Sequence, residues 1–515
     1  MSTMPKIEPP QGPRAVARPV DAGRTLLGIF GEPAVAAVDR SGIVQLADAD
    51  WVLDWWILGA DRWYTPSSEA AVRQQRLGSG PIVQTALRVS DGDVVHRTWA
   101  VHHGDRPGVV VEIENTTKAP VALALAIRPF DLDGRIGQPV VHLGEDHIQV
   151  GDTSLQFSLE VRDTMPDHNA IVIPVPHSVT ARILISGKEA GDQRQIPDLA
   201  TAVRAWDSLI TSKSRVALPD QRLTALFDQG RGRLSLGFHD LHERITALDG
   251  SAGRELAAVA LTGSSTEAGE LLGRLVADDW LPQARRLDEP ESLGAVADGI
   301  AWAAILHAPL LADAVLPVLT QLAQQSRRKR SEPGTQQAER ALARVAKLAG
   351  QGGAARAIDR RLGLGSDPSL PQSVAALSAL TQEASETGSW GDDDIEPVTQ
   401  GLIALRHLLV QERWENDQPE IDLFTEWPTA WRGGAAELHA LPTAFGLISA
   451  AIRWHGYRPA LLWQFDRSDH FQSAIRLRCS ALDPDWSTTA ASGETLLAGA
   501  AGGLGQAPAE GESFS

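Results

Sequence analysis

The amino-acid sequence predicts a multidomain α+β protein, with an antiparallel β-rich region first, then a helical domain, then a short β-unit. Three observations support this fold class. The chain has 515 residues, more than the ~100–200 of an ordinary domain. Short apolar runs alternate with turn signals up to about Ser212, whereas apolar residues recur close to helical spacing from Leu223 onward. Strand-like sequence returns after Glu420 and continues through Asp485.

These changes of pattern set the predicted boundaries. The first residues are rich in Pro and Arg, and the last are rich in Gly, Ala, Glu and Ser, which is typical of flexible termini. The predicted organisation is a disordered arm at 1–22, a β-sandwich at 23–212, a helical domain at 213–415, a C-terminal β-unit at 416–486 and a flexible tail at 487–515.

Two hairpins are predicted in the β-rich region. The tetrapeptide "SDGD" at 90–93 lies between two apolar runs, which is a strong hairpin signal. Residues Asn115–Lys118, "NTTK", lie between "VVVEIE" and "APVALALAIRP", and the same form predicts a second hairpin. Many antiparallel strands at this spacing indicate a large sandwich.

The helical region shows start and stop signals as well as periodicity. Ser264 and Thr266 are suited to opening one helix, and Gly350 to closing another. About nine segments have helical spacing. They span residues 218–240, 252–263, 265–280, 292–308, 311–330, 335–350, 352–363, 370–384 and 395–411.

Composition excludes several classes of function. The formal charge of -18 argues against nucleic acid or an anionic membrane as the main partner. A single cysteine, Cys479, excludes a disulfide framework and a cysteine-rich zinc site. No signal-peptide core and no run of ~20 apolar residues is found. We therefore expect a cytoplasmic protein without a metal or cofactor, and the oligomeric state stays open.

Three blocks carry a family resemblance. They are "GVVVEIENTTKAPVALALAIRPF", the junction "AWDSLITSKSRVALPDQRLTALFDQGRGRLSL" and "WPTAWRGGAAELHALPTAFGLISAAIRWHGYRPALLWQF". With the order of regions, they resemble the six-hairpin glycosidases, which include glucoamylase-like, trehalase-like and glycogen-debranching-type proteins. Most similar is a group of uncharacterised actinobacterial-type relatives. The resemblance implies an N-terminal β-supersandwich, a linker helix, an α/α toroid and a short C-terminal β-sheet unit.

The sequence also departs from that family. The family's toroid has twelve helices, whereas about nine segments here have helical spacing. Whether the toroid of this chain is complete or reduced therefore stays open. Family members usually carry the general acid on a Gly/Trp/Asp-rich stretch in mid-toroid. Here "RKRSEPGTQQAERALARVAK" passes directly from one helix to the next. This departure favours a reduced, non-catalytic member.

Carboxylates before two helices are the catalytic candidates. Inverting glycoside hydrolysis needs two carboxyl groups ~6.5–9.5 Å apart, and in a toroid they lie on loops at one rim. Acidic residues before a helix also favour its positive N-terminal end, so a structural role is the alternative. The candidates are Glu291 in "RRLDEPESLG" and Asp392, Asp393, Asp394 and Glu396 in "GSWGDDDIEP".

Tryptophan is unusually frequent, with 15 residues against Tyr 2. Its flat apolar face and single N–H donor suit sugar stacking, although large core fillers are the alternative. Trp55 and Trp56 are neighbours and cannot face the same side of a strand, so one is expected to be exposed or to pack against the helical domain. Trp55, Trp56, Trp63 and Trp390 are the predicted substrate-binding residues.

The stretch "TAFGLISAAIRWHGYRPALLWQFD" is predicted to be a hairpin. Its side chains alternate, and Gly456 supplies the turn. Arg453 and His455 are expected to tie the C-terminal unit to its neighbours rather than to catalyse.

Two functions stay open, and with them whether the protein is an enzyme. One is a glycoside-hydrolase-like protein that acts on or binds an α-glucan or small glucoside. The other is a non-catalytic glycan-binding or protein-interaction scaffold.

Overall fold

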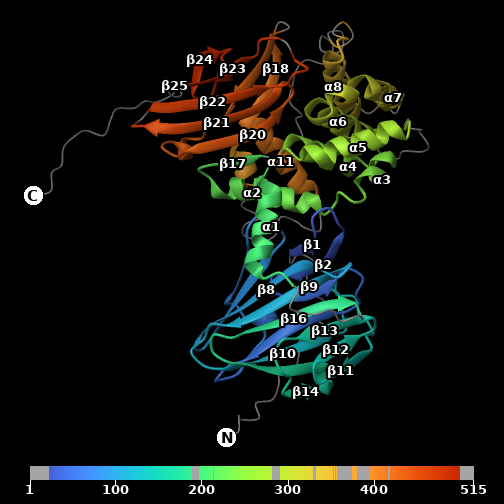
Figure 1. The fold of residues 1–515 in the computed structure, drawn as a ribbon, viewed down its shortest axis with the longest axis vertical. Helices are drawn as coiled ribbons and strands as arrows, with labels where there is room; N and C mark the ends of the chain where they lie inside the picture. The colour runs from blue at the N-terminus through green and yellow to red at the C-terminus, as the bar shows by residue number, and fades with distance from the viewer. Residues whose placement is uncertain are drawn as a thin grey trace, which may run out of the picture. The chain divides into compact units, whose positions relative to one another are not determined.

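A computed structural model (Figure 1) shows that the chain forms two compact units. The first contains the described residues up to Ile210 together with Ser235–His239, and the second contains the remainder. The described residues are 23–187, 196–212, 214–280, 290–328, 332–351, 353, 355, 374–379, 395–415, 418–456, 458–471 and 473–498.

The first unit contains two antiparallel sheets. Figure 1 shows β9 flanked by β8 and β16 in the second of them. One sheet has the order β1-β2-β3-β4-β10-β15-β14 with β5 paired to β4, and consists of β1 (Arg24–Gly28), β2 (Ala34–Asp39), β3 (Val44–Leu46), β4 (Val52–Leu58), β5 (Trp63–Tyr64), β10 (Val121–Arg128), β14 (Asp163–Met165) and β15 (Ala170–Val175). The other has the order β11-β12-β13-β16-β9-β8-β7-β6, and consists of β6 (Val72–Arg76), β7 (Val83–Val89), β8 (Gly92–His103), β9 (Arg106–Asn115), β11 (Val141–Leu143), β12 (His147–Val150), β13 (Thr153–Phe157) and β16 (Thr180–Gly187).

Alternation along the strands builds the core of this unit. On β7, Val83 and Leu87 are buried and Arg88 is exposed, which is the period-2 pattern of a sheet with one buried face. The buried face packs with Leu123 and Ile171 from the other sheet. Burial of one such side chain contributes about 1.5–3 kcal/mol. The prediction of large antiparallel sheets is confirmed.

One predicted hairpin is confirmed and the other is wrong. Val89 pairs with Gly92 across the "SDGD" turn, where Gly92 has φ 151°. The "NTTK" segment instead joins different sheets, because β9 pairs with β8 and β16 while β10 pairs with β4 and β15. The Asn115 side chain donates to the carbonyls of Ala119 and Val175, both at 2.9 Å, and so fixes this crossing. Short loops between apolar runs do not distinguish a hairpin from an arch between sheets.

Helix α1 (Leu199–Thr211) lies inside the range predicted to be β-sandwich. Its Trp206 packs in the first unit with Ile82, Trp99 and Leu236. A Cβ at Gly80 would lie 2.2 Å from Trp206 Cγ, so only glycine leaves room for the indole there.

Helices of the second unit follow most of the predicted segments. α6 packs against both α4 and α8. A Cβ at Gly253 would lie 2.5 Å from the Val296 nitrogen, so glycine permits the close approach of α4 to α6. The helices are α2 (Gln221–Ser235), α3 (Leu241–Thr246), α4 (Gly250–Leu261), α5 (Ser265–Ala277), α6 (Pro290–His307), α7 (Ala312–Arg328), α8 (Glu332–Leu348) and α11 (Glu396–Leu409), with short 3₁₀ turns such as η4 (Pro309–Leu311). Closure of a toroid stays a prediction.

Two further sheets complete the second unit. Strands also form in the ranges predicted to be the helical domain and the tail: β17 and β18 lie in the first, and β25 and the end of β24 lie in the second. The five-stranded sheet has the order β17-β20-β21-β22-β25, with β17 (Arg215–Ala217), β20 (Ala436–Thr443), β21 (Gly446–His455), β22 (Arg458–Arg467) and β25 (Ser492–Leu496). The four-stranded sheet has the order β18-β19-β23-β24, with β18 (Val410–Glu415), β19 (Gln418–Leu423), β23 (Arg476–Cys479) and β24 (Asp483–Thr488).

In the part of the chain that the structure describes, no helix is both long enough and apolar enough to span a bilayer.

Candidate functional site

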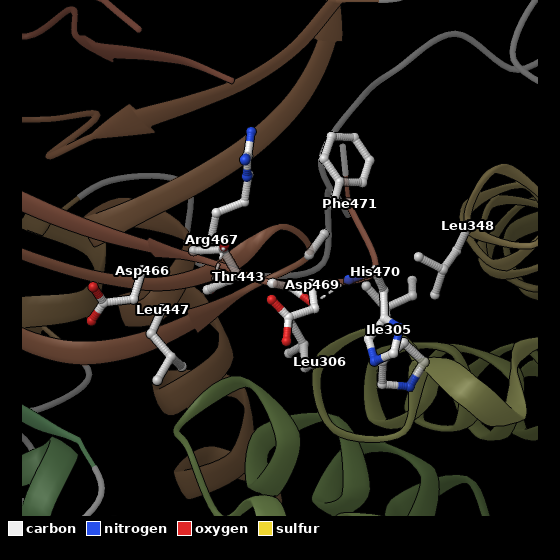
Figure 2. Close-up of a pocket in the computed structure, with 14 residues that line it drawn as sticks. Ile305, Leu306, Leu348, Thr443, Leu447, Asp466, Arg467, Asp469, His470 and Phe471 are labelled. Carbon is white, nitrogen blue, oxygen red and sulfur yellow. Dashed lines mark hydrogen bonds between the residues drawn. The ribbon is translucent and has the colours of Figure 1, made fainter. Parts of the chain in front are cut away.

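A pocket of about 320 Å³ opens in the second unit, between helix ends and the end of a β-hairpin (Figure 2). The hairpin is the predicted one, because β21 pairs with β22 in register from Gly446↔Arg467 to His455↔Arg458. The lining residues come from the ends of α6 and α8, from η4, from the β20–β21 turn and from the segment after β22. They are Ile305, Leu306, Pro309, Leu348, Thr443, Ala444, Gly446, Leu447, Asp466, Arg467, Ser468, Asp469, His470 and Phe471.

A tight turn at Ser468–Phe471 forms the polar wall of the pocket. The Phe471 N–H donates to the Ser468 carbonyl at 3.1 Å, and the Ser468 N–H donates to the Phe445 carbonyl at 2.8 Å. The Phe445 and Phe471 rings also lie 4.8 Å apart, with Phe445 buried. These contacts anchor the turn to the β20–β21 connection, so Asp469 and His470 project from a held backbone.

Helix ends form the apolar wall. Ile305 and Leu306 lie in the last turn of α6, and Leu348 is the last residue of α8. Figure 2 shows Asp469 and His470 close to Ile305 and Leu306. The C-terminal end of a helix carries partial negative charge, so both helices direct their negative ends to this pocket.

Two aspartates and a histidine supply the polar groups. Asp466, Asp469 and His470 are all exposed, and Gln464 Nε2 donates to Asp466 Oδ1 at 3.1 Å. Figure 2 shows the Arg467 side chain directed away from Asp469 and His470. None of these residues was predicted from the sequence. The available signal was "FDRSDHF", which places two acids and a histidine directly after a predicted strand.

A buried ion pair holds the β20–β21 connection, which lines the pocket. Arg406 is 0% exposed, and it donates to Glu412 Oε2 at 2.7 Å and to the Pro442 carbonyl at 2.5 Å. Glu412 in turn accepts from the Ala444 N–H at 3.3 Å. Burial alone would raise the pKa of Glu412, but the charge and hydrogen bonds of Arg406 hold that pKa below its ordinary value. The pair therefore fixes the backbone that carries Thr443 and Ala444.

The predicted catalytic carboxylates do not line this pocket where the structure describes them. Glu396 lies in the first turn of α11, and Arg254 Nε donates to its Oε2 at 2.7 Å. Glu291 is exposed in the first turn of α6. Both positions match the structural alternative of acids at helix N-termini. Asp392, Asp393, Asp394 and Trp390 lie outside the described residues.

Trp55 and Trp56 point to opposite sides of β4, as adjacent strand residues must, yet both are buried. Trp55 is 1% exposed in the core, where its Nε1 donates to the Ser41 carbonyl at 2.9 Å and its ring stacks on His96 at 5.1 Å. Burial lowers the pKa of His96 to about 3, so this imidazole is neutral. Of the two alternatives, exposure of one ring is excluded, packing against the helical domain is not tested, and the substrate-binding role of these tryptophans stays a prediction.

Trp56 is 0% exposed on the other side of β4. It packs with Ala124, Ala126 and Ala170, whose small side chains leave room for the indole, while Trp63 is half-buried against the same cluster. The Trp56 Nε1 donates to Asp54 Oδ2 at 2.9 Å. Complete burial raises the pKa of Asp54 to about 6, although this hydrogen bond and the Arg128 charge oppose the shift.

Arg453 pairs within its own sheet, and the tie to neighbouring elements expected of Arg453 and His455 stays a prediction. Arg453 on β21 forms an ion pair with Glu437 on the neighbouring strand β20. Gly456 has φ 63° in the turn that follows, a left-handed angle that glycine adopts at low cost. The arginine thus joins two strands of one sheet.

Among the described residues, no group of three or more His, Cys, Asp or Glu side chains could hold a metal ion.

Comparison with known proteins assigns no family. No family model matches the sequence, and no curated protein matches it. Among solved structures, a candidate kojibiose phosphorylase from the human microbiome aligns at 7% identity and TM-score 0.38, over 92% of this chain and 91% of that one. A polysaccharide lyase aligns at 10% identity and TM-score 0.18, over 74% of this chain and 82% of that one. At these scores the likeness assigns neither the fold nor the function.

Proposed function

We propose that this chain is a glycoside-hydrolase-like protein of carbohydrate metabolism that binds a small carbohydrate, such as a glucoside or the end of an α-glucan, in the pocket at Asp469. The observation that supports it is the pairing of an apolar wall with a held polar turn in one pocket. The supersandwich and toroid architecture belongs to the same proposal, because it follows from the sequence resemblance. The predicted domain boundaries and a cytoplasmic location, which follow from sequence pattern and composition, belong to it as well.

The chemistry of the pocket suits a sugar. A pyranose has an apolar C–H face and a rim of hydroxyl groups, so it needs one apolar surface and a few placed acceptors and donors. Ile305, Leu306 and Leu348 provide the surface, while Asp469 and His470 provide polar atoms. A volume of about 320 Å³ lies at the small end of ligand pockets, which suits one or two sugar units.

Hydrolysis is the second candidate, because Asp466 and Asp469 line the same pocket. A glycosidase needs one carboxyl group that stays protonated, normally in an apolar surrounding. Both aspartates are exposed, and Asp466 is held by Gln464. Binding without hydrolysis is therefore the stronger proposal, and a scaffold role in protein contact is the remaining alternative.

The test is titration calorimetry of the full chain with glucose, maltose and trehalose, alongside an assay for released glucose. We expect binding of at least one of these sugars without hydrolysis. The Asp469→Asn variant should weaken it about two- to fivefold, the effect of losing one exposed polar contact. Asp485→Asn, an exposed carboxylate in β24 that does not line the pocket, is the matched control. Absence of binding to any sugar, or equal effects of the two variants, would refute the proposal.

A further inference from the structure

The electrostatics of the pocket select among carbohydrates. Asp466 and Asp469 place two carboxylates on its rim, and the nearest lining cation, Arg467, is directed away from Asp469 in Figure 2. Two aspartates against one arginine give the lining side chains a formal charge of −1 when His470 is neutral.

Two helix ends add to this field. α6 has 18 residues and α8 has 17, and both present their C-terminal residues to the pocket. Each long helix carries roughly half a negative charge at that end. His307 and Lys347 lie in the last turns of these helices but do not line the pocket, so they offset the field without contacting a ligand there.

We propose that the pocket prefers a sugar that carries an ammonium group, such as a 2-amino-2-deoxy hexose, over its neutral and anionic counterparts. This inference rests on the proposed carbohydrate function of the same pocket. An ammonium donates up to three hydrogen bonds, for which the Asp469 carboxylate is an acceptor. The helix ends favour the cation through their partial negative charge. A phosphate or carboxylate group would meet only like charge from the aspartates and the helix ends.

The preference has an expected size. An exposed carboxylate–ammonium contact changes Kd about two- to fivefold. A neutral sugar lacks this contact, and an anionic sugar is repelled by the carboxylate instead. The affinities should therefore fall in the order cationic, neutral, anionic. Glucosamine should bind about two- to fivefold more tightly than glucose or N-acetylglucosamine, and glucuronate should bind more weakly than either.

Titration calorimetry at about pH 6, where the amine is protonated, tests this series at low and high salt. Asp469→Asn should reduce the preference for glucosamine over N-acetylglucosamine, and Asp485→Asn should leave it unchanged. If all four sugars bind equally, or if glucuronate binds best, the electrostatic inference is wrong and the proposed function stands. If none of the four binds while maltose or trehalose does, this inference is wrong and the proposed function stands; if none of these sugars binds, both fail.

Discussion

Substitution of Asp54 by Asn provides a direct test of how burial acts on a charged group in the first unit. The Asp54 side chain is 0% exposed and accepts from the Trp56 Nε1 and the Trp55 N–H. Burial raises its pKa from 3.8 to about 6. When folding raises the pKa of a group, its contribution to stability is complete at pH values below the pKa of the unfolded state. The contribution is lost as the pH rises through the pKa of the folded state.

The magnitude follows from the two pKa values. The interval from 3.8 to about 6, at about 1.4 kcal/mol per pKa unit, corresponds to about 3 kcal/mol. Between about pH 4 and pH 7 the wild-type chain should therefore lose about 3 kcal/mol of unfolding free energy through this residue. Asp54→Asn cannot ionise, so relative to wild type its stability should rise by about that amount over the same interval.

Urea denaturation, followed by tryptophan fluorescence at several pH values between 4 and 7, measures the difference. Asp105→Asn removes an exposed carboxylate from the β8–β9 turn of the same unit and is the matched control. If the difference in unfolding free energy between Asp54→Asn and wild type stays constant over this pH range, folding does not raise the pKa of Asp54.

Two further predictions concern the second unit, and a third concerns the carboxylates predicted from the sequence. Arg406→Ala should lower the unfolding free energy by about 3–5 kcal/mol, because it leaves Glu412 charged and buried without its partner; urea denaturation measures this, and a loss below 1 kcal/mol would contradict it. Gly253→Ala should destabilise by about 1–3 kcal/mol through overlap with α6, whereas Gly273→Ala, with nothing within 4 Å of the added Cβ, should stabilise by up to about 1 kcal/mol; thermal unfolding of both should show opposite signs. Replacement of Asp392–Asp394 by Asn should leave any glucose release from maltose unchanged, and its loss would return the catalytic role to that cluster.

Local patterns were sufficient to predict much of the fold. The alternation on β7 and β21 and the helical spacing in α4 to α8 depend on neighbours in the sequence, and all of these elements were predicted. Pairing between distant segments was not predictable in the same way. The "NTTK" segment looks like a hairpin turn, but Asn115 bonds to Val175 on another strand, and no local signal reveals that contact. The strand β25 was missed for the same reason, since its Gly- and Glu-containing sequence becomes a strand by pairing with β22.

The candidate site was harder to predict than the fold. One of Trp55 and Trp56 was expected to be exposed or to pack against the helical domain, but three alanines surround the buried Trp56, and only the assembled sheet reveals that they do. Glu396 was selected for its position before a helix, and its ion pair with Arg254 joins residues far apart in the sequence. Of the two pocket aspartates, Asp469 lies in a turn that contacts Phe445 through both backbone and ring, and Asp466 lies near the end of β22.

The pairing of β17 with β20 has a consequence for the order in which the chain can fold during synthesis. Val216 pairs with Leu438, and the Ser214 hydroxyl donates to the Ala440 carbonyl at 3.0 Å. The five-stranded sheet therefore includes a strand made before the helices and four made after them, with more than 200 residues between the partners. Because domains tend to fold from the N-terminus as they leave the ribosome, the first unit can acquire its sheets early, whereas β17 waits with an unpaired edge until β20 emerges. A chain that ends after α11 would keep that edge open, so we expect it to aggregate rather than to yield an isolated helical domain.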